Sequence, residues 1–387
     1  MSDTPPPLTR RTRTVHAGEN HHEAVWPVVT PIYQATAFAV DEARLSTARH
    51  AADEPSYSRD RFPNVRELEQ AVADLEGADA GCAAASGMAA ISLVFLSFLS
   101  AGDHVVLERG AYCDTEDLVA QVLSRFGVRA TLVDMTDPGT VGAAIEARTR
   151  LVFAETIANP TMQVPDLDAL AAITRRHNAL LAVDNTFATP VLCRPLAHGA
   201  DLVVHSATKF LGGHHDLTAG VVVGSSDLLG QMRRTAYLLG AVPGAMDAWL
   251  ALRGIRTLAP RMAWITQTAG EVAHWLDGNP AVDGVRYPGL TFSDVVARML
   301  PDGAGGMLAF RVAGGDAAAA EVVRRLRLIP YVPSLGGTGT TICFPPRTLD
   351  PRQDARAGEG WLRLSVGLES PEDLIADLAQ ALEGDER

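Results

Sequence analysis

Residues Ala200–Phe210 read ADLVVHSATKF, an apolar segment followed by a polar turn and a lysine, Lys209. The segment predicts a buried strand that ends at the turn, with Lys209 just beyond it. A lysine amine forms a Schiff base with an aldehyde when its surroundings keep it deprotonated, and the hydroxyls of Ser206 and Thr208 are spaced to hold a phosphate. Together they indicate pyridoxal 5'-phosphate (PLP), a phosphorylated aldehyde. A surface lysine after a strand is the alternative interpretation of this stretch alone.

The composition of the 387-residue chain narrows the class of protein. Hydrophobic residues make up 47% and aromatic residues 6%, which suits helices packed closely on a parallel sheet, in two or three domains. The net charge of −13 argues against nucleic-acid binding, and the short basic run from Arg10 to Arg13 is interpreted as a solvated or interface arm. Four scattered cysteines form no zinc or disulfide pattern, so we expect a reducing cytoplasm. We expect no signal peptide, because the N-terminal stretch MSDTPPPLTRR lacks an apolar segment, and no membrane span, because the longest apolar run, Ile91–Leu99, is too short.

Residues 61–255 alternate between strand and helix patterns, which predicts a mostly parallel sheet wrapped in helices. The first helix begins near Val65 and meets a stop signal at Gly77. After a short strand and an apolar helix, the predicted strands are residues 104–108, 129–134, 150–156, 179–185, 201–207 and 218–224. The predicted helices between them are residues 115–126, 140–147 and 166–177.

The two ends of the chain have a different character from this central domain. Residues 1–60 have weak periodicity and are predicted to be an N-terminal arm that lies over another part of the protein or a neighbouring subunit. A long helical stretch, residues 248–276, should be kinked or divided by Pro260 and could bridge two domains. Residues 256–387 predict a small α+β domain, with strands at 305–312 and 361–369 and helices at 317–326 and 371–382.

Polar and small residues follow the predicted strands at their carboxyl ends, where open α/β sheets bind ligands. Ser86–Gly87–Met88 open a helix whose first N–H groups can bind a phosphate, although small residues at a helix start also serve packing. Asp184 ends a strand and could pair with a protonated pyridine nitrogen, or cap the next loop. Asn159 could donate to the phenolic oxygen of a PLP ring, and Tyr112 could stack on its face.

Along the chain these residues form an ordered series: phosphate turn, aromatic ring, amide donor, carboxylate, and hydroxyls with a lysine. The chain resembles the Cys/Met metabolism PLP-dependent enzymes, the group of cystathionine γ-synthase, cystathionine γ-lyase and methionine γ-lyase. The resemblance runs from about residue 31 to residue 382 and lies in YSR, SGMAA, ETIANPT, VDNTFATP, HSATKFLGGH, LRGIRTL and RLSVGLE. It implies an α/β fold, the PLP-dependent transferase fold of aspartate-aminotransferase type I, with a large mostly parallel sheet domain and a small α+β domain.

The resemblance also implies which residues hold the cofactor. Lys209 would form the Schiff base and carry protons, Asp184 would hold the pyridine nitrogen, and Tyr112 would stack on the ring. The implied phosphate ligands are Gly87, Met88, Ser206 and Thr208, together with Tyr57 and Arg59 of a neighbouring subunit. An active site shared in this way requires at least a dimer, and the family implies a homotetramer made of two such dimers.

The resemblance further implies which residues bind the carboxylate of an amino-acid substrate. Arg363 would make a two-pronged bond with that carboxylate, helped by Ser334 and Asn159. Lys209 would remove the α-proton, and Tyr112 would help to protonate the leaving group. The adjacent histidines His214 and His215 have too few companions to suggest a metal site, so no metal is expected.

The chain departs from the family pattern at two places. Gly339 stands where a glutamate is usual, and Phe344 stands where a histidine is common, which predicts a less polar pocket for the distal end of the substrate. After Tyr112 the chain reads Cys113–Asp114, and the cysteine that marks methionine γ-lyases would fall at Asp114. These departures favour neither an ordinary cystathionine substrate nor methionine γ-lyase activity, and Cys113 is interpreted as a packed thiol.

The leading hypothesis is therefore PLP-dependent γ-elimination or γ-replacement on a small γ-substituted L-amino acid. The altered pocket suggests a substrate with an unusual γ leaving group, such as a halide or an acyl ester. β-Elimination, methionine γ-lyase activity or transamination on the same fold are the alternatives. A non-catalytic PLP-fold binding protein is the remaining possibility, against which Lys209, Asp184 and Arg363 argue.

Overall fold

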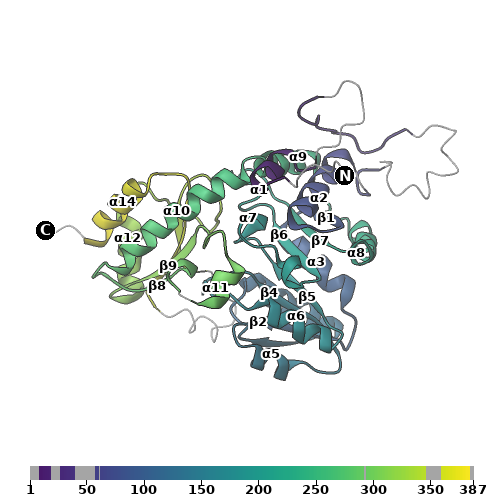
Figure 1. Ribbon diagram of the computed structural model, residues 1–387, viewed down its shortest axis with the longest axis horizontal. Helices are drawn as coiled ribbons and strands as arrows, with labels where there is room; N and C mark the ends of the chain where they lie inside the picture. Colours follow the sequence, from purple (N-terminus) through teal and green to yellow (C-terminus); the bar gives the residue numbers. More distant parts are fainter. Residues whose placement is uncertain are drawn as a thin grey trace, which may run out of the picture.

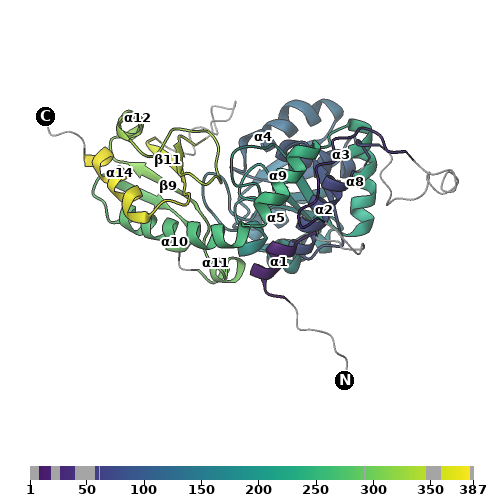
Figure 2. The same ribbon diagram turned by 90° about the horizontal axis from the view of Figure 1, so that it is seen from above.

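The computed structural model describes residues 8–18, 27–39, 57–60, 62–291, 293–345 and 359–383. A seven-stranded sheet and a four-stranded sheet occupy opposite ends of the molecule (Figure 1). The long helix α10 (Leu258–Asp277) runs from one part to the other, and Figure 2 shows the two parts side by side along it. This arrangement confirms the predicted α/β fold, with a large mostly parallel sheet and a smaller α+β part.

The seven-stranded sheet has the strand order β1-β7-β6-β5-β4-β2-β3. Strands β3, β2, β4, β5 and β6 run parallel to one another, whereas β7 pairs antiparallel with both β6 and β1. The strands are β1 (Ala80–Ala84), β2 (His104–Glu108), β3 (Arg129–Val133), β4 (Thr149–Glu155), β5 (Leu180–Asp184), β6 (Leu202–Ser206) and β7 (Gly220–Gly224). Apart from the edge strand β3, their near-continuous apolar runs are buried, because helices cover both faces of the sheet.

Two helical layers enclose this sheet. On one face lie α3 (Gly87–Phe98) and α8 (Ser226–Leu239), and on the other lie α2 (Pro63–Glu76), α6 (Leu167–Arg176) and α9 (Ala245–Ile255). Ser86 caps α3 by accepting from the N–H of Ala89, and Asp166 caps α6 by accepting from the N–H of Ala169. The shorter elements are α1 (Arg10–His16), α4 (Cys113–Asp117), α5 (Pro138–Ala144), α7 (Thr189–Leu192) and the 3-10 turn η4 (Pro195–His198).

The small part is built on an antiparallel sheet of order β10-β11-β9-β8. Helices α10, α12 and α14 pack against it through a separate apolar cluster that includes Phe310 and Leu364. The elements are β8 (Val282–Arg286), η5 (Pro288–Leu290), α11 (Asp294–Met299), β9 (Met307–Val312), α12 (Gly315–Arg325), β10 (Thr341–Cys343), β11 (Trp361–Ser365) and α14 (Pro371–Glu383).

The structure differs from the predicted elements in a few places. The long helical stretch is divided at Arg256–Thr257, and Pro260 sits in the first turn of α10, where a missing N–H costs nothing. The helix predicted at 115–126 is α4 followed by a π-helical turn η2 (Leu118–Val122) and a 3-10 turn η3 (Leu123–Phe126). Strands β8 and β10 and helix α8 were not predicted.

The N-terminal arm is only partly described. Within it, Arg10–His16 form helix α1, which packs on α2 and α10 rather than lying free in solvent. Arg10 donates to the carbonyl of Val191 and pairs with Asp302. Residues 1–7, 19–26 and 40–56 of the predicted arm lie outside the described residues. The predicted domain boundaries after residues 60 and 255 stay predictions. Over the described ranges, no helix is long and apolar enough to cross a membrane.

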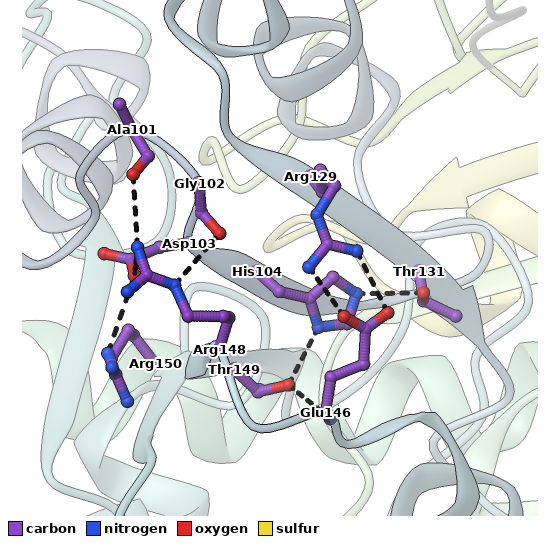
Figure 3. Close-up of polar contacts among 10 residues, drawn as sticks. All are labelled: Ala101, Gly102, Asp103, His104, Arg129, Thr131, Glu146, Arg148, Thr149 and Arg150. Carbon is purple, nitrogen blue, oxygen red and sulfur yellow. Dashed lines mark hydrogen bonds and ion pairs between the residues drawn. The ribbon is translucent and has the colours of Figure 1, made fainter.

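The amino-terminal edge of the large sheet carries a compact polar cluster (Figure 3). The buried ring of His104, at the start of β2, bonds through Nδ1 to Thr149 Oγ1 (2.8 Å) and through Nε2 to Thr131 Oγ1 (2.9 Å). Beside it, Arg129 makes a two-pronged bond with Glu146. These contacts tie β2 to β3 and β4 on both sides.

Candidate active site

A cavity of about 280 Å³ lies at the opposite, carboxyl edge of the large sheet, close to the lower end of the range for small-molecule pockets. Residues that follow β4, β5 and β6 line it, together with residues of the small part of the molecule. The lining residues are Ser86, Gly87, Met88, Ile91, Tyr112, Glu155, Ile157, Asn159, Asp184, Thr186, Phe187, Ser206, Thr208, Lys209, Thr218, Pro333, Leu335 and Arg363.

Lys209 is the only lysine in the chain. It lies in the turn after β6, where its N–H donates to the carbonyl of Ser206, and its Nζ donates to Ser334 Oγ at 3.1 Å. Burial lowers the pKa of its amine, and the positive charge of Arg363 lowers it further. The surroundings therefore favour the neutral, nucleophilic form of the one amine that the sequence predicted to react.

The start of α3 packs directly against the end of β6 at one end of the cavity. A Cβ at Gly87 would lie 2.7 Å from both Cβ and Oγ of Ser206, so only glycine allows this close approach. Thr208 is held by Ala219, whose carbonyl accepts from the threonine Oγ1 (3.2 Å) and whose N–H donates to it (3.1 Å). Helix N–H groups and hydroxyls thus converge at one end of the cavity, as an anion site requires.

Asp184 ends β5 at the cavity wall. Its Oδ1 accepts from the N–H of Thr186 at 2.9 Å, and the Thr186 hydroxyl accepts in turn from the N–H of Ser206. Burial raises the pKa of the Asp184 carboxyl, while Thr186 and the nearby His205 oppose that rise. His205 is itself fully buried and bonds to Glu76 Oε1 at 2.7 Å.

Arg363, on the central strand β11 of the small sheet, reaches the cavity from the other side. It is 4% exposed, and its Nη1 donates to Asn159 Oδ1 at 3.1 Å. Its Nη2 lies 3.2 Å from Cys343 Sγ, on the neighbouring strand β10. The guanidinium is therefore fixed in one orientation and presents a buried positive charge to the cavity.

Tyr112 precedes α4 and is fixed at both its backbone and its hydroxyl. Its N–H donates to Glu155 Oε1 at 2.7 Å, and its hydroxyl donates to Asp114 Oδ2 at 2.7 Å. Burial raises the pKa of the Tyr112 phenol, and Asp114 raises it further. The hydroxyl is thus held in its neutral, protonated form.

Several predicted residues lie elsewhere in the single chain. Tyr57 is 43% exposed, and the guanidinium of Arg59 lies 4.6 Å from the ring centre of Tyr237, so neither lines the cavity. Gly339 and Phe344 are also absent from its lining. The ring centre of Phe344 lies 6.3 Å from that of Tyr331 instead.

The sequence prediction missed Thr186 and Cys343. Thr186 donates its N–H to Asp184, and Cys343 contacts the guanidinium of Arg363. Thr186 lies within the quoted stretch VDNTFATP, so its place two residues after Asp184 was the available signal. Cys343 gave no signal, because only the pairing of Cys343 with Arg363 across β10 and β11 brings it into the site. Glu155, the last residue of β4, also lines the cavity, although the sequence prediction gave it no role.

The comparisons with known proteins agree with this geometry. A family model described as Cys/Met metabolism PLP-dependent enzyme matches residues 11–383. The chain is 41% identical to an L-methionine gamma-lyase of Porphyromonas gingivalis, over 96% of each chain. It is 39% identical to a cystathionine beta-lyase of Lactococcus lactis subsp. cremoris, over 96% of this chain and 98% of the other. The crystal structure of a cystathionine gamma-lyase from Lactobacillus plantarum, complexed with L-serine, matches with a TM-score of 0.90 at 32% identity, covering 97% of this chain and 99% of that one.

Proposed function

The chain belongs to the Cys/Met metabolism family of PLP-dependent enzymes, and from that premise we propose that it eliminates or replaces the γ-substituent of a small L-amino acid. The family consists of PLP-dependent lyases of sulfur amino-acid metabolism. The observation that carries the finer proposal is the placement of Lys209 and Arg363 on the same cavity. One supplies an amine beside the reacting carbon, and the other supplies a fixed positive charge for a carboxylate.

The cavity residues fit PLP. The start of α3, Ser206 and Thr208 would hold its phosphate, because they line the cavity together and the first N–H groups of a helix bind anions. Asp184 would hold the ring nitrogen, whose positive charge favours the ionised carboxylate against the effect of burial. When bound, PLP supplies an electron sink for the bonds broken at the substrate's α-carbon.

Arg363 would orient the substrate. Asn159 contacts Nη1 and Cys343 contacts Nη2, which fixes the plane of the guanidinium. A planar guanidinium in a fixed orientation can bind a carboxylate through two N–H groups. Fixing the α-carboxylate in this way sets which bond of the α-carbon faces Lys209.

Proton transfer falls to the two residues that flank the cavity. The Lys209 amine, whose pKa is lowered by burial and by Arg363, takes the proton from Cα and can then deliver or remove a proton at a neighbouring carbon. The Tyr112 hydroxyl stays protonated and donates to Asp114, and it would have to turn from that carboxylate to give its proton to a departing γ-group.

Two finer points belong to the same proposal. Tyr57 and Arg59 would complete the phosphate site of a neighbouring subunit, which fits their position outside the chain's own cavity and implies an active-site-sharing dimer, doubled into a tetramer. The relatives named above are called methionine or cystathionine lyases, and none of their names refers to a substrate with a halide leaving group. We therefore propose a sulfur leaving group in place of the halide. The Lactococcus relative supports β-elimination as the second candidate.

Product analysis tests the proposal. Purified protein loaded with PLP is incubated with L-cystathionine, L-methionine and L-cysteine, with Lys209→Ala as the control. We expect 2-oxobutanoate and ammonia from at least one γ-substituted substrate. Pyruvate as the main product from cystathionine would replace the proposal with β-elimination, and an oxo acid without ammonia would replace it with transamination.

A further inference from the structure

Glu155 occupies the end of β4, between two parts of the site described above. The residue is 5% exposed and is among those that line the cavity. Oε1 accepts from the N–H of Tyr112 at 2.7 Å, and Oε2 accepts from the N–H of Asn159 at 2.8 Å. One buried side chain thus satisfies two backbone donors from segments that are distant in sequence.

Each of these two segments carries a side chain that the proposed chemistry uses. Tyr112 places the ring and the hydroxyl on one side of the cavity, and Asn159 holds Arg363 on the other. Neither backbone N–H belongs to a strand ladder, so the carboxylate replaces the pairing that regular structure would otherwise provide. A shift of Glu155 would move both segments at once.

Glu155 is itself anchored from the neighbouring strand. Its N–H donates to Glu108 Oε2 at 2.7 Å, and Glu108 ends β2, the strand beside β4. Only a carboxylate offers an acceptor at both of its ends, whereas the amide of glutamine offers one acceptor and one donor. Both oxygens of Glu155 therefore act as acceptors, and an amide at this position would lose one of the two bonds.

We propose that Glu155 is a positioning residue, whose two carboxylate oxygens set the distance between the aromatic side of the cavity and its carboxylate-binding side. It touches neither substrate nor the reacting atoms in this role and acts through Tyr112 and Asn159. The inference rests on the function proposed above, since that function gives these two residues their tasks.

The test compares Glu155→Gln with a matched control, Asp377→Asn. Asp377 is also a buried carboxylate that accepts from backbone N–H groups, those of Arg327, Leu328 and Ile329, but it lies on α14, away from the cavity. Both variants are expected to lower Tm by similar amounts, because each loses hydrogen bonds to buried donors. Only Glu155→Gln is expected to raise KM and to lower kcat/KM, by about 10- to 100-fold.

Amide hydrogen exchange on the unmodified PLP-loaded protein gives a second readout that needs no variant and no substrate. The amides of Tyr112 and Asn159 should exchange as slowly as buried strand amides. Fast exchange of either one, or a Glu155→Gln enzyme with wild-type KM and kcat and a lowered Tm, would overturn the inference. Absence of turnover in the wild type would instead count against the proposed function, while the exchange rates would still decide the role of Glu155.

Discussion

The two ends of the strands in the seven-stranded sheet hold their ionisable groups in opposite ways. At the amino-terminal edge, His104 is neutral, with its pKa lowered by burial and both ring nitrogens bonded to hydroxyls, and Glu146 faces Arg129 (Figure 3). At the carboxyl edge, Glu108, Glu155 and Asp184 end three neighbouring strands, and burial raises the pKa of each carboxyl.

The difference indicates that the amino-terminal edge of the sheet stabilises the fold, whereas the carboxyl edge carries the site. The amino-terminal edge pairs its charges or holds a group neutral, so its contacts can only stabilise the fold. The carboxyl edge gathers acids on one side and places the Lys209 amine and the Arg363 cation on the other. Such an arrangement costs stability and is typical of a site that binds charged ligands.

The largest expected effect is at Lys209. Lys209→Ala removes the only lysine amine, so we expect the visible absorption of bound PLP to disappear and turnover to fall by about 10²–10⁴-fold from lost proton transfer alone. Reduction of the wild type with borohydride, followed by mass spectrometry, should place one cofactor adduct at Lys209. An adduct on the α-amino group alone would contradict this role.

Arg363→Ala comes next. Removing a buried charge partner of the substrate carboxylate should cost about 3 kcal/mol, a loss of roughly 100-fold in kcat/KM with a raised KM. Because Arg363 lowers the pKa of Lys209, the variant should also take up PLP only at higher pH than the wild type. Arg311→Ala, an exposed arginine on the adjacent strand β9, is the control. An unchanged KM in the Arg363 variant would remove Arg363 from the substrate site.

Glu108→Gln tests how much stability the buried acids at the carboxyl ends of the strands cost. Burial raises the pKa of Glu108 from its ordinary value of 4.5 to about 8. The native state therefore holds a proton that the unfolded state releases, and the stability linked to that proton is lost as pH rises from about 4.5 to about 8. The neutral amide has no such proton, so the variant should gain stability relative to the wild type over this range. Urea unfolding at several pH values measures the difference; a constant difference from pH 4 to pH 9 would be inconsistent with a buried, protonated Glu108.

The smallest effect is expected at Glu146→Gln, on the amino-terminal edge. Its ion pair with Arg129 is exposed to solvent, where such pairs contribute little and are screened by salt. KM, kcat and PLP affinity should match the wild type, and Tm should stay within experimental error. A change in KM would show that a contact at the amino-terminal edge affects the site at the carboxyl edge, contrary to the division of roles described above.

Much of the fold was predictable because its signals are local. The apolar runs of β2, β4 and β6 and the stop signal at Gly77 each lie within one element. Strand β10, with three residues, is too short to show a period, and the π-helical turn after α4 keeps the apolar spacing of an ordinary helix.

The site was less predictable where a contact depends on the assembled fold. Lys209, Asp184 and Arg363 stand in recognisable stretches, and the structure places all three on the cavity. The two backbone bonds of Glu155 and the contact between Cys343 and Arg363 depend on strand pairing and loop paths, which leave no trace in residue spacing. For the same reason the sequence marked Gly339 and Phe344 as pocket residues, although neither lines the cavity.

The antiparallel strand β7 has a consequence for the order in which a newly synthesised chain can acquire its site. Ala80 pairs with Gly224, and Gly220 packs directly on the carbonyl of Ser86, so the turn before α3 meets the loop of Lys209 only when β7 is in place. Arg363 follows still later in the chain. During synthesis, the start of α3 therefore leaves the ribosome well before Ser206 and Thr208, the other part of the anion site. A nascent chain that ends before β7 has an incomplete binding site for the cofactor.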